Sequence, residues 1–289
     1  MVAWNLERGW HLDTWARVPA LRDSDLLLLT ELDVGMARSG NRHVARDLAQ
    51  KLGLQWAFAP QFRELTLGLP GERRRVRGQV NREALHGLAI LSRLPILSAQ
   101  ALALPDAYDW SQAYEARQGG RIGLISELAT PGGGRLWAVC THLECYADPQ
   151  QRALQMRVLL AALDPGPCIL GGDLNTTTGN LRSKRSLLGL AARRALTPWR
   201  LANPIPLEPV FAVTESAGFS HQGANLRGVG TGIPHWLPAW PRRLRPRVDW
   251  ILLRGLEPEA GSATVDPTPR VDTRRLSEHD GVGVAVRLP

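Results

Sequence analysis

Cysteine is scarce in this sequence, with three residues at Cys140, Cys145 and Cys168. Their number is odd and no C-x-x-C pair occurs, which argues against a disulfide framework and against a thiolate zinc site. Cys140 and Cys168 lie in apolar runs typical of strands. We therefore expect these two side chains to be buried thiols.

Long apolar runs are also missing. No stretch of eighteen apolar residues occurs, so we predict no membrane-spanning helix and no stable membrane insertion. No signal peptide, period-fixed repeat or domain linker is evident. We expect residues 1–289 to form one domain that acts in the cytoplasm as a monomer. An exported form stays open, because the first strand begins almost at Met1 and a leader could precede it.

Lysine is nearly absent, since it occurs only at Lys51 and Lys184. Arginine supplies the other positive charges, and the formal net charge is +8 with a pI of about 10.3. The planar donor fork of arginine suits phosphate. A basic chain favours anionic partners such as nucleic acid, phosphorylated metabolites or acidic lipid surfaces, but it does not select among them.

Segments with strand and helix patterns alternate along the chain. The predicted strands are residues 1–5, 25–32, 54–60, two strands within 87–104 broken at 93–95, a hairpin over 120–144 with its turn at 132–134, and 167–175, 247–256 and 280–289. The predicted helices are residues 13–22, 41–52, 148–163 and 181–194, the third with Asp148 as N-cap and Pro149 in the first turn. Residues 60–83 and 221–247 show no clear pattern. This order predicts a strand-rich α/β protein in which helices cover sheets that pack on each other.

Residues 169–180, "ILGGDLNTTTGN", end an apolar strand with two glycines, an acid and an amide. An ordinary loop explains this pattern equally well, because Asp173 and Asn175 can bond their own backbone in an Asx turn. The rest of the sequence has to decide between a turn and a functional site.

Polar side chains occur at the ends of several predicted core strands. These residues are Asn5 with Glu7, Glu31, His142, Asp173 with Asn175, Asp249 at a strand start, and His279 just before the last strand. An antiparallel partner brings the start of one strand to the edge where its neighbour ends. One rim of the sheets could therefore collect all of these side chains. Each of them alone is more simply explained as a solvated or locally bonded residue.

In chain order the motifs read "WNLE", "TE", "GLAILSR", "THLE", "RALQ", "GGDLN", "RVDW" and "SEHD". This set resembles the endonuclease/exonuclease/phosphatase superfamily, which includes deoxyribonuclease I, abasic-site endonucleases, inositol polyphosphate 5-phosphatases and neutral sphingomyelinases. The resemblance covers residues 2–286 and is most specific in "GGDLN" and "SEH". It implies a four-layer α/β sandwich in which two mixed, mostly antiparallel sheets pack face to face with helices outside and the active site at one rim.

Two positions depart from the family pattern. Glu278 stands where the family usually has aspartate, and Thr30 stands where many members have glutamine. The third motif, "THLECYADP", is closer to the tyrosyl-DNA phosphodiesterase, sphingomyelinase and general phosphodiesterase branches than to abasic-site endonucleases. The motifs therefore imply a phosphoesterase without naming its substrate.

The resemblance also implies roles for individual residues. Mg²⁺, for which Mn²⁺ substitutes, is expected on Glu31 with Asn5, Glu7 and Glu278 as further ligands. The expected catalytic residues are Asp173 to orient or deprotonate water, Asn175 and His142 to contact phosphoryl oxygens, His279 as base or charge stabiliser, and Asp249 to orient His279. Together they would hydrolyse a phosphodiester bond.

Substrate residues are harder to assign. Arg121 is a candidate phosphate ligand or a structural arginine, and Arg152 and Gln155 are expected to support the site. The remaining candidates are Trp236, Trp240, Arg242 and Arg243, which suit a nucleic acid with stackable bases. We expect DNA or RNA as the substrate. The alternatives are a phosphomonoesterase acting on inositol phosphates, a lipid phosphodiesterase, and a non-catalytic binder of nucleic acid or protein.

Overall fold

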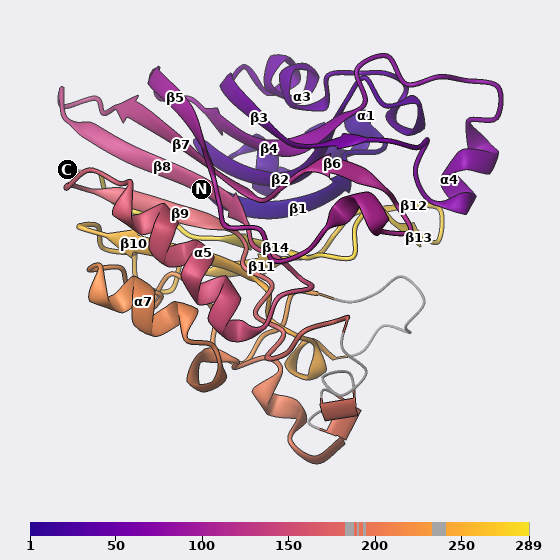
Figure 1. Ribbon diagram of the computed structural model, residues 1–289. Coiled ribbons are helices and arrows are strands. Elements are labelled where there is room, and N and C mark those ends of the chain that lie inside the picture. Colours follow the sequence, from indigo (N-terminus) through magenta and orange to yellow (C-terminus); the bar gives the residue numbers. More distant parts are fainter. Residues whose placement is uncertain (183–187, 190, 193–194, 233–240, 289) are drawn as a thin grey trace.

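Two sheets packed face to face form the centre of the computed structural model (Figure 1). The structure describes residues 1–182, 188, 189, 191, 192, 195–232 and 241–288. The first sheet contains, in spatial order, β11 (Thr264–Asp266), β14 (Gly281–Gly283), β1 (Val2–Arg8), β2 (Leu26–Val34), β4 (Leu85–Ser92), β3 (Gln55–Glu64) and β6 (Arg117–Gly119). The second contains β10 (Asp249–Arg254), β9 (Cys168–Asp173), β8 (Arg135–His142), β7 (Ile122–Ala129) and β5 (Ile96–Ala103). A hairpin of β12 (Arg270–Val271) and β13 (Arg274–Arg275) stands apart from both sheets.

Each sheet mixes parallel and antiparallel pairs in the same way. Strands β1 and β2 are parallel in the first sheet, and β8 and β9 are parallel in the second. The other strand pairs of the two sheets are antiparallel. The predicted mixed, mostly antiparallel sheets are therefore confirmed.

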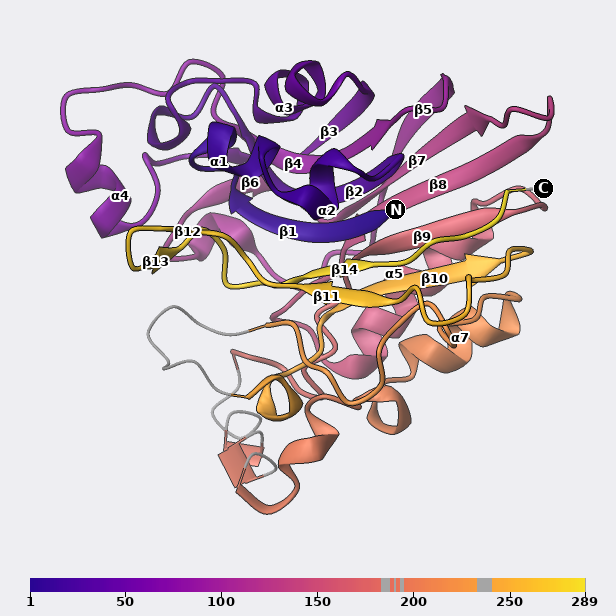
Figure 2. The ribbon, with the colours of Figure 1, turned by 180° about the vertical axis from the view of Figure 1, so that it is seen from behind.

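Helices cover the outer faces, which gives four layers (Figures 1 and 2). The first sheet is covered by α1 (Leu12–Ala16), α2 (Pro19–Arg22) and α3 (Val44–Leu52), and the second by α5 (Pro149–Ala161) and α7 (Val210–Ser216). The short helices elsewhere are α4 (Pro70–Arg75), η1 (Ala37–Ser39), η2 (Trp110–Gln112), η3 (Pro198–Arg200), η4 (Ile205–Leu207) and η5 (Arg242–Leu244). Among the described residues, no helix is both long enough and apolar enough to cross a bilayer.

Three apolar clusters match the spaces between the layers. The inner faces of the two sheets share one cluster, in which Leu28 and Ile90 of the first sheet join Leu124 and Ile169 of the second. The alternation of side chains along a strand sends the neighbouring residues to the outer faces, where helices bury them. Cys140 and Cys168 are both buried free thiols, as predicted. Burial raises the pKa of Cys168 to about 12, so this thiol stays protonated at neutral pH.

Helix α5 begins where the sequence predicts and ends two residues earlier, at Ala161, whereas α3 ends where the sequence predicts and begins three residues later, at Val44. In α5, Pro149 occupies the first turn, and the side chain of Gln151 accepts a hydrogen bond from the Asp148 backbone at 2.9 Å. In α3, Gly53 follows the last turn with φ of 66°, the left-handed conformation that favours glycine at a helix C-terminus.

Several predicted boundaries are wrong. The strands predicted at 1–5, 25–32 and 54–60 run on to Arg8, Val34 and Glu64, because bulges keep polar residues within the ladder. Residues 60–83 therefore include the end of β3 as well as α4. The last strand is confined to Gly281–Gly283.

The helix predicted at 13–22 is two short helices. The residue before Pro19, Val18, is extended, as expected when a proline follows. Part of the helix predicted at 181–194 lies outside the described residues.

Candidate active site

Strand register places three of the polar residues side by side in the second sheet. His142, at the end of β8, pairs with Asp173 at the end of the parallel strand β9. Asp173 in turn pairs with Asp249, at the start of the antiparallel strand β10. Two strand ends and one strand start therefore meet at a single edge, as the antiparallel argument predicted.

The two glycines before Asp173 fit this close packing. Gly172 has φ of 132°, and a Cβ there would collide with the carbonyl oxygen of Thr141 on β8. A Cβ on Gly171 would press on Leu28 and Ala3 of the facing sheet. Glycine is required at this point because strands and sheets approach each other too closely for a side chain.

Asp173 takes part both in an Asx turn and in the polar group at the rim. Its Oδ1 accepts a hydrogen bond from the Asn175 backbone at 3.0 Å, which is the Asx turn of the simpler interpretation. Its Oδ2 faces three polar groups: Asn5 Nδ2 at 3.2 Å, His142 Nε2 at 3.4 Å and His279 Nε2 at 3.7 Å. The acid is 2% exposed. The turn thus fixes the carboxylate so that its other oxygen points at the rim.

Backbone irregularities aim residues of the first sheet at the same rim. The register between β1 and β2 shifts between Asn5 and Arg8, and the register between β2 and β4 shifts around Glu31. Glu7, Arg8 and Glu31 all have positive φ, between 44° and 78°. Side chains rarely adopt this conformation, and such residues cluster at functional sites. The bulges turn Glu31 away from the sheet face and toward the rim.

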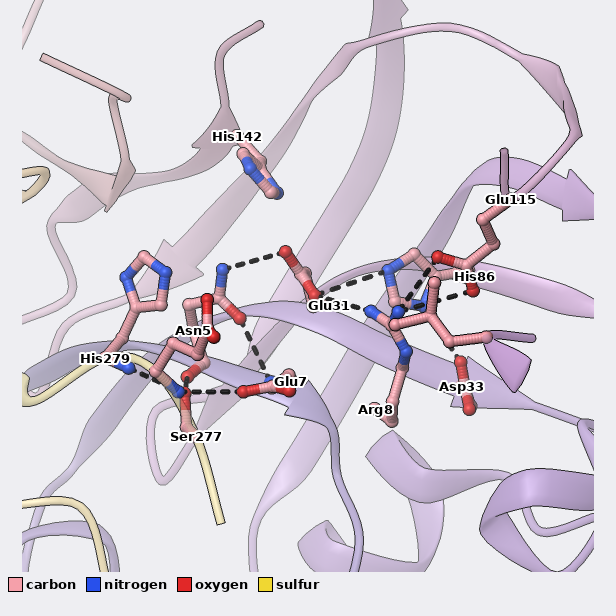
Figure 3. Close-up of polar contacts among 12 residues, drawn as sticks. Asn5, Glu7, Arg8, Glu31, Asp33, His86, Glu115, His142, Ser277 and His279 are labelled. Atoms are coloured by element: carbon pink, nitrogen blue, oxygen red, sulfur yellow. Dashed lines mark hydrogen bonds and ion pairs between the residues drawn. The ribbon is translucent and has the colours of Figure 1, made fainter. Parts of the chain in front are cut away.

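Asn5 links the two sheets. Its amide nitrogen donates to Glu31 Oε1 at 3.0 Å as well as to Asp173, and its oxygen accepts from the Glu7 backbone at 3.0 Å. In Figure 3, Asn5 and Glu31 lie between His279 on one side and Arg8, His86 and Glu115 on the other. Asn5 therefore holds the two acids in a fixed relation.

His279 is held through both its ring and its backbone. Its Nδ1 lies 2.9 Å from Asp249 Oδ2, which also accepts from the Thr231 hydroxyl at 2.7 Å. Its backbone N–H donates to Ser277 Oγ, and that hydroxyl donates to the Asn5 carbonyl at 2.7 Å. Residues 277–279 are thereby tied to β1 and β10.

The two histidines at the rim are pushed toward opposite charge states. Burial and the charge of Arg121 lower the pKa of His142 to about 3, so this ring is neutral at pH 7. Burial also disfavours charge on His279, but Asp249 and Asp173 outweigh it and raise its pKa well above the ordinary value. Burial, reinforced by Asp249, raises the pKa of Asp173. Paired groups whose pKa values are driven apart are typical of acid–base sites.

Glu31 is an ionised carboxylate beside this group. Burial alone would raise its pKa, but the charge of Arg8 at 2.9 Å, together with His142, holds the pKa well below its usual range. The Glu31 side chain is 19% exposed. Each of its oxygens accepts one hydrogen bond and keeps a lone pair for a further partner.

The other residues predicted to hold metal are arranged differently. Glu7 Oε2 accepts from the Glu278 backbone N–H at 2.8 Å, so these two residues meet next to Asn5. Asn175 was predicted to contact a phosphoryl oxygen. One of its amide N–H groups donates to the Leu143 carbonyl at 2.8 Å, and the second N–H is left for another acceptor.

The predicted arginines serve mainly as supports. Arg121 is buried and donates to Glu144 at 3.0 Å, so its charge is paired inside the protein. Arg152 is fully buried in a pair with Glu208 at 2.7 Å, and Gln155 bonds the Glu144 backbone. Arg152 and Gln155 are therefore buried inside the protein and do not lie on its surface.

The predicted substrate loop is described only in part. Trp236 and Trp240 lie outside the described residues. Arg242 and Arg245 both donate to Asp280 at 3.0 Å, directly after His279, whereas Arg243 is exposed. The described part of the segment, residues 241–247, therefore lies beside the rim, and Arg242 and Arg245 are already paired there.

Beyond Glu31 lies a buried ion cluster that sequence reasoning missed. Its members are Arg8, Asp33, Arg38, Glu64, Glu72, Glu115 and Arg117. Arg8 and Arg38 each bridge several of its acids, and His86 Nδ1 lies 2.8 Å from Asp33. The only sequence signal was the arginine that follows "WNLE". The cluster fixes Arg8 and, through it, Glu31.

We expect the buried ion cluster to make the free energy of unfolding depend on pH. Burial alone would raise the pKa of Glu115, but Arg8, Arg117 and Arg38 lower it to about 2. A depressed folded-state pKa stabilises the fold above the ordinary value of 4.5, and this stabilisation is lost as pH falls from 4.5 toward 2. Glu115→Gln should lower the free energy of unfolding at pH 7 by on the order of 3 kcal/mol and flatten its decline below pH 4.5.

Urea unfolding at several pH values measures this effect. Glu127→Gln is the matched control, because its partner Arg135 is 72% exposed and such pairs contribute less than about 1 kcal/mol. Equal losses of unfolding free energy in the two variants would show that Glu115 in the buried ion cluster stabilises the fold no more than an exposed ion pair does.

Comparison with known proteins agrees with this geometry. A family model, the Endonuclease/Exonuclease/phosphatase family, matches residues 2–279. Similar solved structures include an endonuclease/exonuclease/phosphatase from Beutenbergia cavernae, with 19% identity, a TM-score of 0.62 and coverage of 99% of this chain and 70% of that chain. An AP endonuclease from Archaeoglobus fulgidus shows 14% identity, a TM-score of 0.59 and coverage of 99% and 98%. The 3′ phosphatase NExo from Neisseria, bound to a product DNA hairpin, shows 16% identity, a TM-score of 0.57 and coverage of 99% and 98%.

A search of curated proteins finds no match. At these identities the solved structures show the fold, whereas the family model spans nearly the whole chain. Its members are phosphodiesterases, nucleases and phosphatases. The chain therefore belongs to the endonuclease/exonuclease/phosphatase family.

Proposed function

We propose that this protein is a metal-dependent phosphodiesterase that hydrolyses nucleic acid, with residues 1–289 as one domain. The observation that carries the proposal is the convergence of Asn5, His142 and His279 on one oxygen of Asp173. Phosphodiester hydrolysis needs a group that orients water and donors that neutralise the phosphoryl oxygens. This rim offers both within one hydrogen-bonded set.

The residues at the rim fit a hard divalent cation. Glu31 is ionised, partly exposed and retains free lone pairs, and its neighbours offer oxygen donors of the kind that Mg²⁺ prefers. Glu31 would hold the metal, with Asn5, Glu7 and Glu278 as the further candidates. When bound, Mg²⁺ or Mn²⁺ would polarise a phosphoryl oxygen and offset charge on the leaving group.

A second group of possible ligand atoms belongs to the acid–base set instead. Asp173, Asp249 and His279 present ligand atoms within 4.8 Å of one another. However, Asp249 Oδ2 already accepts from Thr231 and contacts His279 Nδ1. We therefore assign these three residues to proton transfer and charge stabilisation.

The acid–base residues would have separate roles in hydrolysis. Asp173 Oδ2 would orient the attacking water and accept its proton, since the Asx turn already fixes the carboxylate. His279, held as the imidazolium by Asp249, would donate to a non-bridging phosphoryl oxygen. Neutral His142 would donate its Nε2 proton to the phosphoryl or leaving oxygen, with the second amide N–H of Asn175 as a further donor.

Nucleic acid is the preferred substrate class because the chain is basic and the similar proteins include a phosphatase seen with DNA. A substrate panel tests this choice: single- and double-stranded DNA and RNA, an abasic duplex, a tyrosyl phosphodiester, inositol phosphates, sphingomyelin and a chromogenic diester. We expect the highest kcat/KM on a nucleic acid. A higher value on inositol phosphates or sphingomyelin would place the protein in the corresponding alternative class.

The loop beside Asp280 gives a further prediction. Arg243 is exposed and Arg242 and Arg245 are paired, so we expect Arg243→Ala to raise the KM for nucleic acid about three-fold and leave a small chromogenic diester unchanged. Arg242→Ala with Arg245→Ala should lower turnover of both substrates, because Asp280 next to His279 loses two partners. Steady-state kinetics on the two substrates separates these cases. The loop has no role in binding if neither variant changes the KM for nucleic acid.

A further inference from the structure

Trp10, just after β1, is contacted by two arginines from distant parts of the chain, and we call these three residues the clamp. The Arg75 guanidinium, at the end of α4, lies 4.1 Å from the indole centroid, and that of Arg274, in β13, lies 5.0 Å from it. Figures 1 and 2 both show α4 beside the β12–β13 hairpin. Two cations are thus held next to each other on one aromatic ring.

Two hollows adjoin this clamp. One has a volume of about 410 Å³, is lined by Trp10 and Arg75, and extends toward Arg42. The other has a volume of about 260 Å³, is lined by Trp10, Arg75 and Arg274, and reaches Glu7. The two hollows share Trp10 and Arg75 in their linings, and we call them together the Trp10 groove. It ends at Glu7, which bonds the Glu278 backbone at the catalytic rim.

The clamp carries uncompensated positive charge. Among the described residues, neither Arg75 nor Arg274 forms an ion pair, and both side chains are exposed. Burial and the nearby charge of Arg274 both lower the pKa of Arg75, which reflects repulsion between like charges. An anion between the two guanidinium groups would relieve that repulsion.

Acidic residues along the groove have other partners or lie at its edges. Asp13 pairs with Lys51 at 2.7 Å, and both oxygens of Glu72 contact arginines of the buried ion cluster. Asp272 lines the smaller hollow and is exposed. Arg42, Arg275 and His11 add further cationic or basic groups to the lining. The groove as a whole therefore favours an anionic ligand.

We propose that the Trp10 groove binds the sugar–phosphate backbone of the nucleic-acid strand next to the bond that is cut, with a phosphate between Arg75 and Arg274. This assignment rests on the proposed function for the identity of the strand. Both guanidinium groups lie over the Trp10 ring, so the indole serves to orient the arginines. Backbone contacts of this kind position a strand without reading its sequence.

A polymer fits the groove better than a lone phosphate. One hollow is also lined by Arg42 and the other by Arg274 and Glu7, so together they offer room for more than one phosphate. The direction from Arg75 through Arg274 to Glu7 leads to the rim that holds Asp173 and Glu31. This path also avoids the loop at Arg242 and Arg245, both of which pair with Asp280.

Binding measured without cleavage tests the groove. The probe is a fluorescein-labelled single-stranded oligodeoxynucleotide in EDTA, followed by anisotropy over a range of salt concentrations. We expect Arg75→Gln with Arg274→Gln to weaken binding about ten-fold and to reduce the slope of log K against log salt by roughly 0.7, the value for one phosphate contact. Hydrolysis of a chromogenic diester with Mg²⁺ should stay within about two-fold of wild type.

Arg73→Gln with Arg74→Gln is the matched control, because it removes the same charge from exposed positions of the same helix outside the groove. We expect this control to change the Kd less than two-fold. Equal losses in the two double variants, no loss in the groove variant, or no binding by wild type would each overturn the proposal. Binding that depends on the groove without hydrolysis of any substrate would retain the groove and reject the proposed function.

Discussion

His279→Ala should lower kcat for phosphodiester hydrolysis about 10²–10⁴-fold, and Asp249→Ala added to it should lower kcat little further. His279 Nδ1 lies 2.9 Å from Asp249 Oδ2, and Thr231 holds that same oxygen. The two side chains act as one unit, in which Asp249 orients the His279 ring and keeps it in the imidazolium form. Once the ring is gone, Asp249 has nothing left to orient, so the two losses should not multiply.

A milder variant separates orientation from charge. Asp249→Asn keeps the shape of the side chain but removes the carboxylate that raises the pKa of His279, so that pKa should fall. NMR titration of the His279 ring measures this pKa directly, and the activity profile should lose its alkaline limb at a correspondingly lower pH. An unchanged His279 pKa in Asp249→Asn would show that Asp249 does not control the charge of the ring. If the losses of kcat in the two single alanine variants multiply in the double variant, His279 and Asp249 do not act as one unit.

Glu31→Gln should have the second large effect, a loss of activity of about 10²-fold or more at ordinary Mg²⁺ concentrations. The amide keeps the hydrogen bond to Asn5 but removes the ionised oxygen that suits a hard cation. Excess Mg²⁺ or Mn²⁺ should restore part of the activity, because weaker binding is overcome by mass action. Thermal stability should change little, since Arg8 keeps Glu72 and Glu115 as partners.

Titration of activity with Mg²⁺ measures this effect. Glu83→Gln removes the same charge from an exposed position and should leave the metal dependence unchanged. If Glu31→Gln loses activity to the same extent at all metal concentrations, Glu31 acts by a route other than metal affinity.

The order of predicted strands and helices indicated helices that cover packed sheets, and the resemblance of the motifs implied the four-layer sandwich. "THL", "GGD" and "VDW" each place a polar residue at a strand terminus, and strand pairing aligns His142, Asp173 and Asp249. Burial of the strands on both faces leaves a polar side chain few places except the rim.

Bulges and groups formed by distant partners were beyond the sequence. The sequence predicted Glu31 at the rim as the end of a strand, but β2 is bulged there and continues to Val34, and the φ of 60° at Glu31 cannot be read from "LLTELDV". The buried ion cluster joins positions from 8 to 117, and its members look like ordinary surface charges in sequence. The clamp on Trp10 likewise depends on two arginines almost two hundred residues apart. Such groups are defined only by tertiary contacts.

Hydrolysis of bis(p-nitrophenyl) phosphate by EDTA-treated protein tests the central claim most directly, because this substrate reaches the rim without using the Trp10 groove or the loop at Arg243. Wild type should be inactive in EDTA and active after Mg²⁺ or Mn²⁺ is added in excess. Asp173→Asn should stay inactive under both conditions, since the oxygen that faces Asn5, His142 and His279 loses its charge. Full activity of wild type in EDTA, or activity of Asp173→Asn equal to wild type, would contradict a metal-dependent phosphodiesterase at this rim.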